Sequence, residues 1–370
     1  MIQRAVIAGG KTGGHLYPGI AVAEEILLRN PEATVTFIGT EEGIEARVLP
    51  KLGYTLKTIT VSRLKGAGLA GRIMGLLRVP VAMLQTLLTL LRLRPQVVLG
   101  VGGYASGPAL LAAWFARYPT AIQEQNATPG FTNRILGRLV RAVYLGFGAA
   151  SIHFSDDKTL ETGNPIRHSL CEQLKAAVDG AATTPDTRGI SVLIFGGSQG
   201  ASFLNQNVPE AVHRFRQAHP DVQLTVTHQT GRHDEAATRE RYEDLGLASL
   251  VEVLPYIDDM PGAYAAADVA ICRAGALTVA EVTAVGLPCL LVPFPYAADN
   301  HQQANAQVLV DGGAGHMVVQ SEWQTEEVAA WLGRIATNPE ERVRMAQSAR
   351  RLARPDATRD LVNHLEVLAA

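Results

Sequence analysis

The sequence predicts an α/β protein built from two doubly wound parallel sheets. At 370 residues the chain exceeds the size at which a single hydrophobic core stops growing, so we expect two domains. Each half alternates short apolar segments with helical patterns of about ten to fifteen residues, which is typical of parallel strands joined by crossover helices. Glycine-rich turns follow several of the apolar segments. The composition, 47% apolar and 18% charged, is globular rather than disordered.

The first half contains four strand-like segments, at residues 5–8, 33–39, 96–100 and 120–122. Helical patterns cover residues 20–28, 41–52 and 110–117. Glycine-rich turns at residues 9–15 and 101–108 directly follow two of the strands. In a doubly wound sheet, turns at the carboxyl ends of the strands border the ligand-binding crevice.

The second half repeats this plan without repeating the sequence. Strand-like segments lie at residues 191–195, 224–226, 251–253, 269–272 and 288–292. The helix predicted after the turn at residues 196–200 has an apolar face formed by Leu204, Val208, Ala211, Val212 and Phe215. Further helices are predicted at residues 277–285 and 299–310, and Asp356 is expected to cap a last helix that ends near residue 369.

Two domains are therefore expected to face one another across a cleft. The first covers residues 1–164 and the second residues 165–354, and the last helix, within residues 355–370, is expected to pack back onto the first. Small and polar residues at 175–189 predict a linker.

The charges are distributed unevenly. Between residues 46 and 123 there is no acidic residue but there are ten Lys or Arg, so this stretch carries +10 and the remainder −12. Such a block favours an anionic partner, which is a nucleic acid, a membrane surface or a phosphorylated substrate.

Residues 72–94 are the most apolar part of the chain. Arg78, Gln85, Thr89 and Arg92 recur at helical spacing and form a polar stripe, and Pro80 is expected to interrupt the segment. We therefore expect an amphipathic element rather than a membrane span. Its apolar face meets either the protein core or a membrane surface, and the sequence leaves this open.

The cysteines indicate a reducing compartment. Cys171, Cys272 and Cys289 are odd in number and lack metal-ligand spacing. The first strand is predicted to begin almost at once, so we expect no signal peptide.

The turn Gly9-Gly10-Lys11-Thr12-Gly13-Gly14-His15 carries the most chemical information. It lacks the glycine that a P-loop needs five residues before its Gly-Lys pair, and its spacing is not that of a dinucleotide fingerprint. No ligand cluster near His15 suggests a metal. What remains is an anion-holding turn that ends in an imidazole, which either accepts a proton from an attacking alcohol or merely caps its helix.

Two turns in the second half could hold a diphosphate. Gly196-Gly197-Ser198 and Gly275-Ala276-Leu277-Thr278 are each expected to open a helix and direct its positive end into the cleft. Arg167, at the crossing between the domains, can grip phosphate oxygens bidentately. Glu281, one helical turn after Thr278, either accepts hydrogen bonds from a ribose diol or is a solvated helix residue.

Eight motifs in order resemble those of the bacterial cell-wall glycosyltransferases that convert lipid I to lipid II. The motifs are Thr12-Gly13-Gly14-His15-x-x-Pro18, Gly102-Gly103-Tyr104-x-Ser106-Gly107-Pro108, Glu124-Gln125-Asn126, Gly163-Asn164-Pro165-x-Arg167, Gly196-Gly197-Ser198-Gln199-Gly200, Tyr256-Ile257-Asp258-Asp259-Met260, Arg273-Ala274-Gly275-Ala276-Leu277-Thr278-Val279-x-Glu281 and Asp299-Asn300-His301-Gln302-x-x-Asn305-Ala306. Each motif alone is weak, but together they cover nearly the whole chain and are highly specific.

The resemblance implies an inverting, metal-independent GT-B glycosyltransferase without a cofactor. It would add N-acetylglucosamine from UDP-N-acetylglucosamine to the C4 hydroxyl of the muramyl sugar of undecaprenyl-diphospho-muramyl-pentapeptide. The first domain would hold this acceptor and the second the UDP-sugar. The family is peripheral at the cytoplasmic face of the inner membrane, so the basic, apolar region at residues 63–94 would meet an anionic membrane surface rather than a nucleic acid.

The resemblance also assigns roles to individual residues. His15 would be the general base, Ile257 would contact the uracil and Glu281 the ribose. Asn126, Gln302 and the Thr12-Gly13-Gly14 turn would approach the sugar and phosphate from across the cleft. The residues expected at the diphosphate, or in the helix turn that binds the donor, are Arg167, Ser198, Ala276, Leu277, Thr278, Val279 and Ala280.

Two positions depart from the family pattern. Lys11 stands where family members usually have glycine or no residue, which puts the backbone geometry of that turn in doubt. Gln123 replaces a frequent histidine, so no acid–base role is expected there. Two rival functions remain at this point: a UDP-N-acetylglucosamine 2-epimerase on the same fold, and a non-catalytic lipid- or nucleotide-binding module. The charged, amphipathic region argues against the epimerase, which needs no lipid acceptor.

Overall fold

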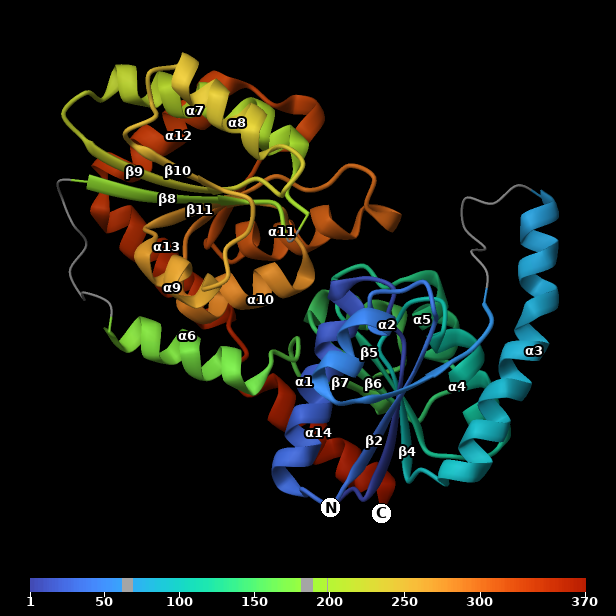
Figure 1. Ribbon diagram of the computed structural model, residues 1–370. Coiled ribbons are helices and arrows are strands. Elements are labelled where there is room, and N and C mark those ends of the chain that lie inside the picture. The colour runs from blue at the N-terminus through green and yellow to red at the C-terminus, as the bar shows by residue number, and fades with distance from the viewer. Residues whose placement is uncertain (62–68, 181–188, 198) are drawn as a thin grey trace. The chain divides into compact units, whose positions relative to one another are not determined.

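The computed structural model describes residues 1–61, 69–180, 189–197 and 199–370. The chain divides into two compact units (Figure 1). Unit 1 comprises Met1–His168 and Arg354–Ala370, and unit 2 comprises Ser169–Ala353. Each unit contains a parallel sheet covered by helices on both faces, so the α/β fold with two Rossmann-like sheets predicted from the sequence is confirmed.

The sheet of unit 1 has seven strands in the order β3-β2-β1-β4-β5-β6-β7, and all neighbouring strands are parallel. The strands are β1 (Arg4–Ala8), β2 (Thr34–Gly39), β3 (Thr55–Thr58), β4 (Val97–Gly100), β5 (Thr120–Glu124), β6 (Ala142–Leu145) and β7 (Thr159–Glu161). The strand order reverses between β1 and β4, and in open α/β sheets ligands bind at such a switch point. The turns that follow β1 and β4 therefore lie where this rule places a site.

Both faces of this sheet are buried. Ile7 belongs to the core cluster beneath α1 (Gly13–Arg29) and α14 (Ala357–Ala369), whereas its neighbour Val6 belongs to the cluster beneath α3 (Leu69–Leu93) and α4 (Ser106–Phe115). Successive side chains of a strand point to opposite faces, so a sheet covered on both sides needs apolar residues at consecutive positions. Figure 1 shows α1 and α14 side by side on one face and α3 and α4 on the other.

The C-terminal helix α14 belongs to unit 1 although the chain reaches it last. Leu361, Val362 and Leu365 are buried in the same cluster as Ile26 of α1. The Arg29 guanidinium also forms a 3.4 Å ion pair with Glu366. Docking of α14 therefore closes the core of unit 1 from the opposite end of the sequence.

The sheet of unit 2 has six parallel strands in the order β10-β9-β8-β11-β12-β13. They are β8 (Gly189–Phe195), β9 (Gln223–Gln229), β10 (Val251–Leu254), β11 (Val269–Cys272), β12 (Cys289–Leu291) and β13 (Gly315–Met317). The helices with residues in this unit are α6 (His168–Gly180), α7 (Ser202–Ala218), α8 (Glu235–Asp244), α9 (Met260–Ala266), α10 (Ala276–Val285), α11 (His301–Asp311), α12 (Thr325–Thr337) and α13 (Pro339–Leu352). One cluster, which includes Ile194, Phe215 and Trp331, joins the sheet to α7 and α12.

Several predicted elements differ from the structure. Residues 41–52 form a short α2 (Glu45–Val48) and a 3₁₀ turn (Pro50–Leu52) instead of one helix, because the Glu45 side chain turns back to bind the preceding loops. The helix α1 begins at Gly13 and α4 at Ser106, so the predicted starts of these two helices, at residues 20 and 110, were wrong. The helix α7 begins at Ser202 and buries the predicted apolar face.

Two predicted interruptions, the first part of the linker and the break at Pro80, are also corrected. Residues 175–180 continue helix α6 and are not a linker, and residues 181–188 lie outside the described residues. The helix α3 runs through Pro80 without a break, because a proline removes one backbone hydrogen bond and the remaining bonds of a 25-residue helix maintain it. Asp356 is the N-cap residue of α14, which ends at Ala369, as predicted, but its side chain pairs with Arg359 at 3.0 Å and makes no capping hydrogen bond.

The described helices include none that is both long enough and apolar enough to cross a bilayer.

Candidate active site

The turns after β1 and β4 interlock at the switch point of unit 1. Gly9, Gly10, Gly102 and Gly103 all have positive φ, and the Gly10 amide donates to the Gly102 carbonyl at 3.3 Å. A Cβ on Gly9 would lie 2.3 Å from the Gly102 carbonyl oxygen, and a Cβ on Gly103 would lie 2.6 Å from the Gly10 carbonyl oxygen. Glycine is required here because two backbones approach within the space that a side chain would occupy.

The buried carboxylate of Glu45 holds the first turn in place. Its Oε2 accepts from the Lys11 amide at 2.6 Å, and its Oε1 accepts from the Thr40 amide at 2.9 Å and the Thr40 hydroxyl at 2.8 Å. Glu45 is 1% exposed. It thereby ties the loop after β1 to the loop after β2, a role that no sequence motif indicates.

Lys11 adopts the left-handed conformation, with φ 77°. This conformation costs a non-glycine residue about 1–2 kcal/mol, which explains why glycine suits the position. The hydrogen bond from its amide to Glu45 offsets that cost, and its Nζ lies 4.2 Å from the centroid of the Tyr104 ring in a cation–π contact.

His15 stands in the first turn of α1. Thr12 is the N-cap residue, and Gly13 and Gly14 are the first two helical residues, whose amides point out of the helix end. The Thr12 hydroxyl lies 3.1 Å from His15 Nδ1. When Nδ1–H donates to Thr12, Nε2 becomes the basic nitrogen of the ring. The imidazole also packs against Gly102, where a Cβ would lie 2.6 Å from His15 Cδ2.

The loop after β5 places Asn126. Glu124, which is 2% exposed, accepts hydrogen bonds from the Asn126 amide at 2.9 Å, the Gly130 amide at 3.1 Å and the Asn133 side chain at 2.8 Å. Burial raises the pKa of the Glu124 carboxyl. Glu124 therefore shapes the loop that carries Asn126.

Gln123 has a structural role. Its side chain is fully buried and its Nε2 donates to Asn164 Oδ1 at 3.1 Å, while Asn164 Nδ2 donates to the Gln125 carbonyl at 3.0 Å. The amide pair joins the end of β5 to the segment that leads to Arg167. The Arg167 guanidinium lies 5.2 Å from the centroid of the Tyr17 ring on α1, so Arg167 belongs to unit 1.

In unit 2, the described residues Gly197, Gln199 and Gly200 of the loop after β8 pack on the end of β9 and the residues that follow it. A Cβ on Gly200 would lie 1.8 Å from the Thr230 carbonyl oxygen. Gln229, 3% exposed, donates to the Gly197 carbonyl at 2.8 Å and accepts from the Ile257 amide at 3.2 Å. Gln229 therefore positions Ile257 beside this loop. Ser198 lies outside the described residues.

The first turns of α10 contain Ala276, Leu277, Thr278, Val279 and Ala280, and the helix begins one residue before the predicted start. Asn305 of α11 donates to the Ala274 carbonyl at 3.1 Å and so fixes the loop before this helix.

The carboxylate of Glu281, also on α10, accepts from the Tyr264 hydroxyl at 2.8 Å. Burial and the Glu281 charge raise the pKa of Tyr264, so the phenol remains a donor. The sequence analysis missed both Gln229 and Tyr264. Tyr264 follows the motif at residues 256–260 by four positions, whereas no motif lies near Gln229.

A cavity of 470 Å³ in unit 2 is lined by Gly196 and Gly200 of the loop after β8 and by Gln302, and its volume is in the range of small-molecule sites. Gln302 Oε1 accepts from the Phe294 amide at 2.9 Å. Arg273 forms part of the cavity wall and donates hydrogen bonds to the Val292 and Pro293 carbonyls. Burial lowers the pKa of the Arg273 guanidinium to about 10. Gln302 therefore belongs to unit 2, the same unit as this loop.

Among the described residues there is no group of three or more His, Cys, Asp or Glu that could hold a metal ion.

The described part of unit 1 brings together Thr12, Gly13, Gly14 and His15. In unit 2, the helix turn at residues 276–280 continues directly to Glu281.

The chain matches two domain models of one glycosyltransferase family. Residues 5–145 match the glycosyltransferase family 28 N-terminal domain, and residues 191–361 match the glycosyltransferase family 28 C-terminal domain. A UDP-N-acetylglucosamine–N-acetylmuramyl-(pentapeptide) pyrophosphoryl-undecaprenol N-acetylglucosamine transferase of an Anaeromyxobacter species is 47% identical over 98% of this chain and 92% of its own.

Two solved structures refine the comparison. The crystal structure of Acinetobacter baumannii MurG has a TM-score of 0.82 and 32% identity, over 98% of this chain and 99% of its own. A Neisseria meningitidis UDP-GlcNAc 2-epimerase has a TM-score of 0.66 at 16% identity, over 98% of this chain and 99% of its own, which shows a shared fold alone. The chain belongs to the family of UDP-N-acetylglucosamine–N-acetylmuramyl-(pentapeptide) pyrophosphoryl-undecaprenol N-acetylglucosamine transferases, with both domains of glycosyltransferase family 28.

Proposed function

We propose that this protein transfers N-acetylglucosamine from UDP-N-acetylglucosamine to the C4 hydroxyl of the muramyl sugar of lipid I, which yields lipid II. The observation that carries the assignment of the chemistry is the placement of His15. Its imidazole is held between the Thr12 hydroxyl and Gly102 at the amino end of α1. A base is needed there because the acceptor alcohol loses a proton as it attacks.

In the proposed mechanism the acceptor oxygen attacks the anomeric carbon while the bond from that carbon to UDP breaks on the opposite face. The proton of the hydroxyl passes to His15 Nε2. The amino end of α10 at Ala276, Leu277 and Thr278, together with Arg167 and Ser198, would stabilise the charge that develops on the diphosphate. Inversion at the anomeric carbon follows from this single displacement.

The remaining proposed contacts divide between the units. In unit 2, Ile257 would bind the uracil and Glu281 the ribose, while Gln302 would reach the sugar. In unit 1, Asn126 and the amides of Gly13 and Gly14 would meet the sugar and the lipid-linked diphosphate. The helix turn of Val279 and Ala280 would complete the donor site.

Replacement of His15 tests the mechanism. His15→Ala should lower kcat by about 10²–10⁴-fold, because that is the usual contribution of a general base, and should leave UDP affinity nearly unchanged. Equal losses in kcat and in UDP affinity would contradict the base assignment and support a positioning role. The assay follows the disaccharide-lipid product formed from UDP-N-acetylglucosamine and a lipid I analogue. Product formation that EDTA does not change would support metal-independent transfer. Formation of N-acetylmannosamine would instead indicate an epimerase, and no turnover would indicate a binding module.

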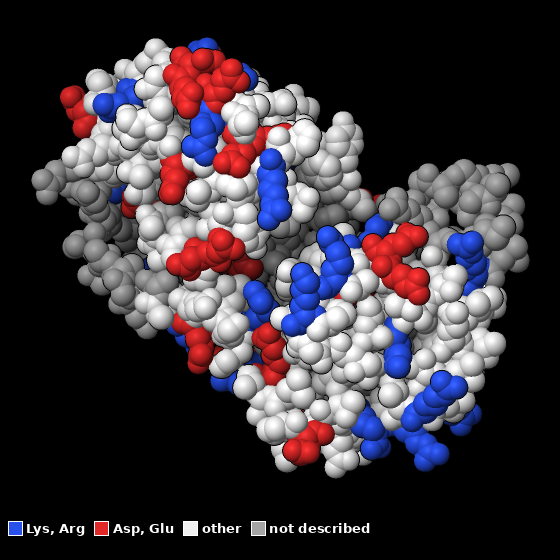
Figure 2. All heavy atoms as spheres, viewed as in Figure 1, with Lys and Arg blue, Asp and Glu red and all other residues white. Residues whose placement is uncertain are grey.

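We also propose that unit 1 docks on an anionic membrane surface at the cytoplasmic face. The apolar residues of α3 lie on two faces: Ala82 and Leu90 are buried in the core, whereas Val81, Leu84, Leu88 and Leu91 are 48–57% exposed. The exposed set recurs every three or four residues and forms one stripe along the helix. Figure 2 shows Lys and Arg side chains spread over the visible face of unit 1.

Charge and apolar area would act together at such a surface, because each signal alone binds weakly. The expected docking region, residues 63–94, is described only from Leu69 onward, and residues 63–68 lie outside the described residues. The triple variant Leu84→Ser, Leu88→Ser and Leu91→Ser should lose flotation with vesicles that contain an anionic lipid. Leu28→Ser, a 58% exposed leucine on α1, is the matched control. Equal flotation of both variants would contradict the docking face.

A further inference from the structure

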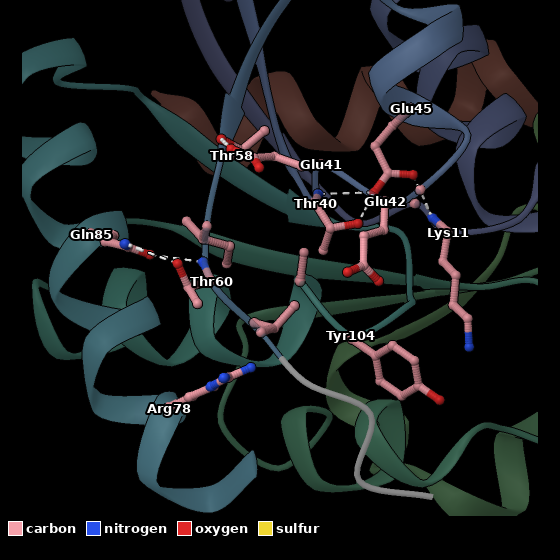
Figure 3. Close-up of a pocket in the computed structure, with 15 residues that line it drawn as sticks. Lys11, Thr40, Glu41, Glu42, Glu45, Thr58, Thr60, Arg78, Gln85 and Tyr104 are labelled. Carbon is pink, nitrogen blue, oxygen red and sulfur yellow. Dashed lines mark hydrogen bonds between the residues drawn. The ribbon is translucent and has the colours of Figure 1, made fainter. Parts of the chain in front are cut away.

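A polar cavity in unit 1 lies beside the His15 turn and has no role in the transfer chemistry described above (Figure 3). Its volume is 450 Å³. The loops after β1, β2, β3 and β4 form most of its wall, and α3 closes one side. The wall includes Gly10 and Lys11, so it begins close to His15 in the same turn.

The walls of this cavity are tied together by hydrogen bonds. Gln85 of α3 accepts from the Thr60 amide at 2.8 Å and donates to the Thr60 hydroxyl at 3.3 Å. Glu45 connects the Lys11 amide to Thr40 on the neighbouring loop. The cavity is therefore built by the fold before a ligand enters it, as small-molecule sites usually are.

The lining carries charges of both signs. Glu41 and Glu42 come from the loop after β2, Lys11 from the loop after β1 and Arg78 from α3. In Figure 3 the Glu42 carboxylate and the Arg78 guanidinium point toward the middle of the cavity from opposite sides. Hydroxyl and amide groups of the Thr60 and Gln85 region add donors and acceptors between them.

We propose that this cavity binds the peptide arm of the acceptor, an assignment that rests on the proposed function. The peptide of a muramyl sugar is attached through the lactyl group on C3, the carbon next to the C4 hydroxyl that reacts. With that hydroxyl at His15, the peptide must leave the sugar close to the reacting atoms. The cavity at Lys11 offers space at that point.

The charge pattern selects a peptide over the other parts of the substrates. A diphosphate would be repelled by the negative charges of Glu41 and Glu42. A prenyl chain would bury the polar groups of the wall without offering them hydrogen-bond partners. A stem peptide carries carboxylates and an amine besides its backbone amides. Arg78 and Lys11 complement the carboxylates, and Glu41 and Glu42 complement the amine.

The test compares acceptors rather than absolute rates. The probes are three lipid I analogues: one with a lysine-containing pentapeptide, the same peptide with its lysine Nε acetylated, and one that ends at the lactyl amide. The kcat/KM ratios between them are measured for the wild type, for Glu41→Gln/Glu42→Gln and for Arg78→Gln. Glu32→Gln is the matched control, since Glu32 is an exposed acid of unit 1 away from the cavity.

We expect the wild type to prefer the pentapeptide acceptor over the lactyl amide. In both cavity variants the kcat/KM ratio between these two acceptors should fall about 5-fold, because an exposed ion pair contributes free energy of that size. The double Glu variant should also lose discrimination between lysine and acetyl-lysine, whereas Glu32→Gln keeps both ratios. A misfolded variant would lose activity on all acceptors together, so the ratios still report on the cavity.

Unchanged ratios in both cavity variants would overturn the assignment while the transferase activity stands. Absence of wild-type transfer to every acceptor would overturn the proposed function and the peptide site with it.

Discussion

The Glu45 carboxylate provides the sharpest test of how unit 1 builds its active site. It is 1% exposed and accepts three hydrogen bonds, one from Lys11 and two from Thr40. Gly10, Gly39 and Gly43 surround it so closely that a Cβ on any of them would lie within 2.7 Å of a Glu45 atom. The side chain therefore has neither space nor freedom to rearrange.

In Glu45→Gln one carboxylate oxygen becomes an NH₂ donor. The amide oxygen can keep both bonds to Thr40, but the NH₂ group then faces the Lys11 amide, donor against donor. Loss of a charge-assisted hydrogen bond costs about 1.5–3 kcal/mol and a buried amide without an acceptor costs about 1–3 kcal/mol. We expect the turn to be destabilised by about 3 kcal/mol, which raises its opening equilibrium about 100-fold.

Amide hydrogen exchange measures this opening directly. Peptides that contain the Lys11 and Thr40 amides should exchange about 100-fold faster in Glu45→Gln than in the wild type, whereas peptides from unit 2 should not change. Glu32→Gln, an exposed glutamate in the same unit, should exchange like the wild type throughout. Wild-type exchange at Lys11 and Thr40 in Glu45→Gln would refute the reasoning.

Three further changes follow from single contacts. Gly102→Ala places a Cβ against the His15 ring and should lower kcat about 10-fold or more, since small displacements of a catalytic group are costly. Tyr264→Phe removes the donor to Glu281 and should raise the KM for the UDP-sugar about 10-fold, the effect of one hydrogen bond to a charged group, with a smaller change in kcat. Burial lowers the pKa of His228 to about 3, so the unfolded chain binds a proton that the native state excludes. The free energy of unfolding therefore falls by about 1.4 kcal/mol per pH unit as the pH drops below about 6.5. In urea unfolding experiments, His228→Gln should show a correspondingly smaller slope of this free energy against pH.

Each of these changes has a control that separates the contact from a general effect. Gly53 has φ 79°, and no neighbouring atom would lie within 4 Å of a Cβ at this position, so Gly53→Ala should cost similar stability and spare kcat. Tyr296 is 83% exposed, so Tyr296→Phe should leave the KM for the donor unchanged. His233 has a 98% exposed side chain, so His233→Gln should retain most of the pH slope. A control that behaves like its test variant would contradict the corresponding contact.

The sequence alone determined the two α/β halves, the glycine turns and the family. These features are local: apolar segments of strand length, helical spacing and glycine at strand ends are readable within a window of a few residues. The predicted strand at residues 269–272 matches β11 (Val269–Cys272) for this reason. Lys11 stands out for the same reason, because a lysine in a glycine-rich turn is visible without a structure.

The tertiary structure alone decided which distant residues meet. Glu45 reaches Lys11 because β2 lies beside β1 in the sheet, and Tyr264 reaches Glu281 across the packing of α9 on α10. The two apolar faces of α3 share one helical periodicity, so only docking on the core distinguishes Leu90, which is buried, from Leu91, which is 55% exposed. Contacts of this kind depend on strand order and helix docking, and no local pattern in the sequence encodes them.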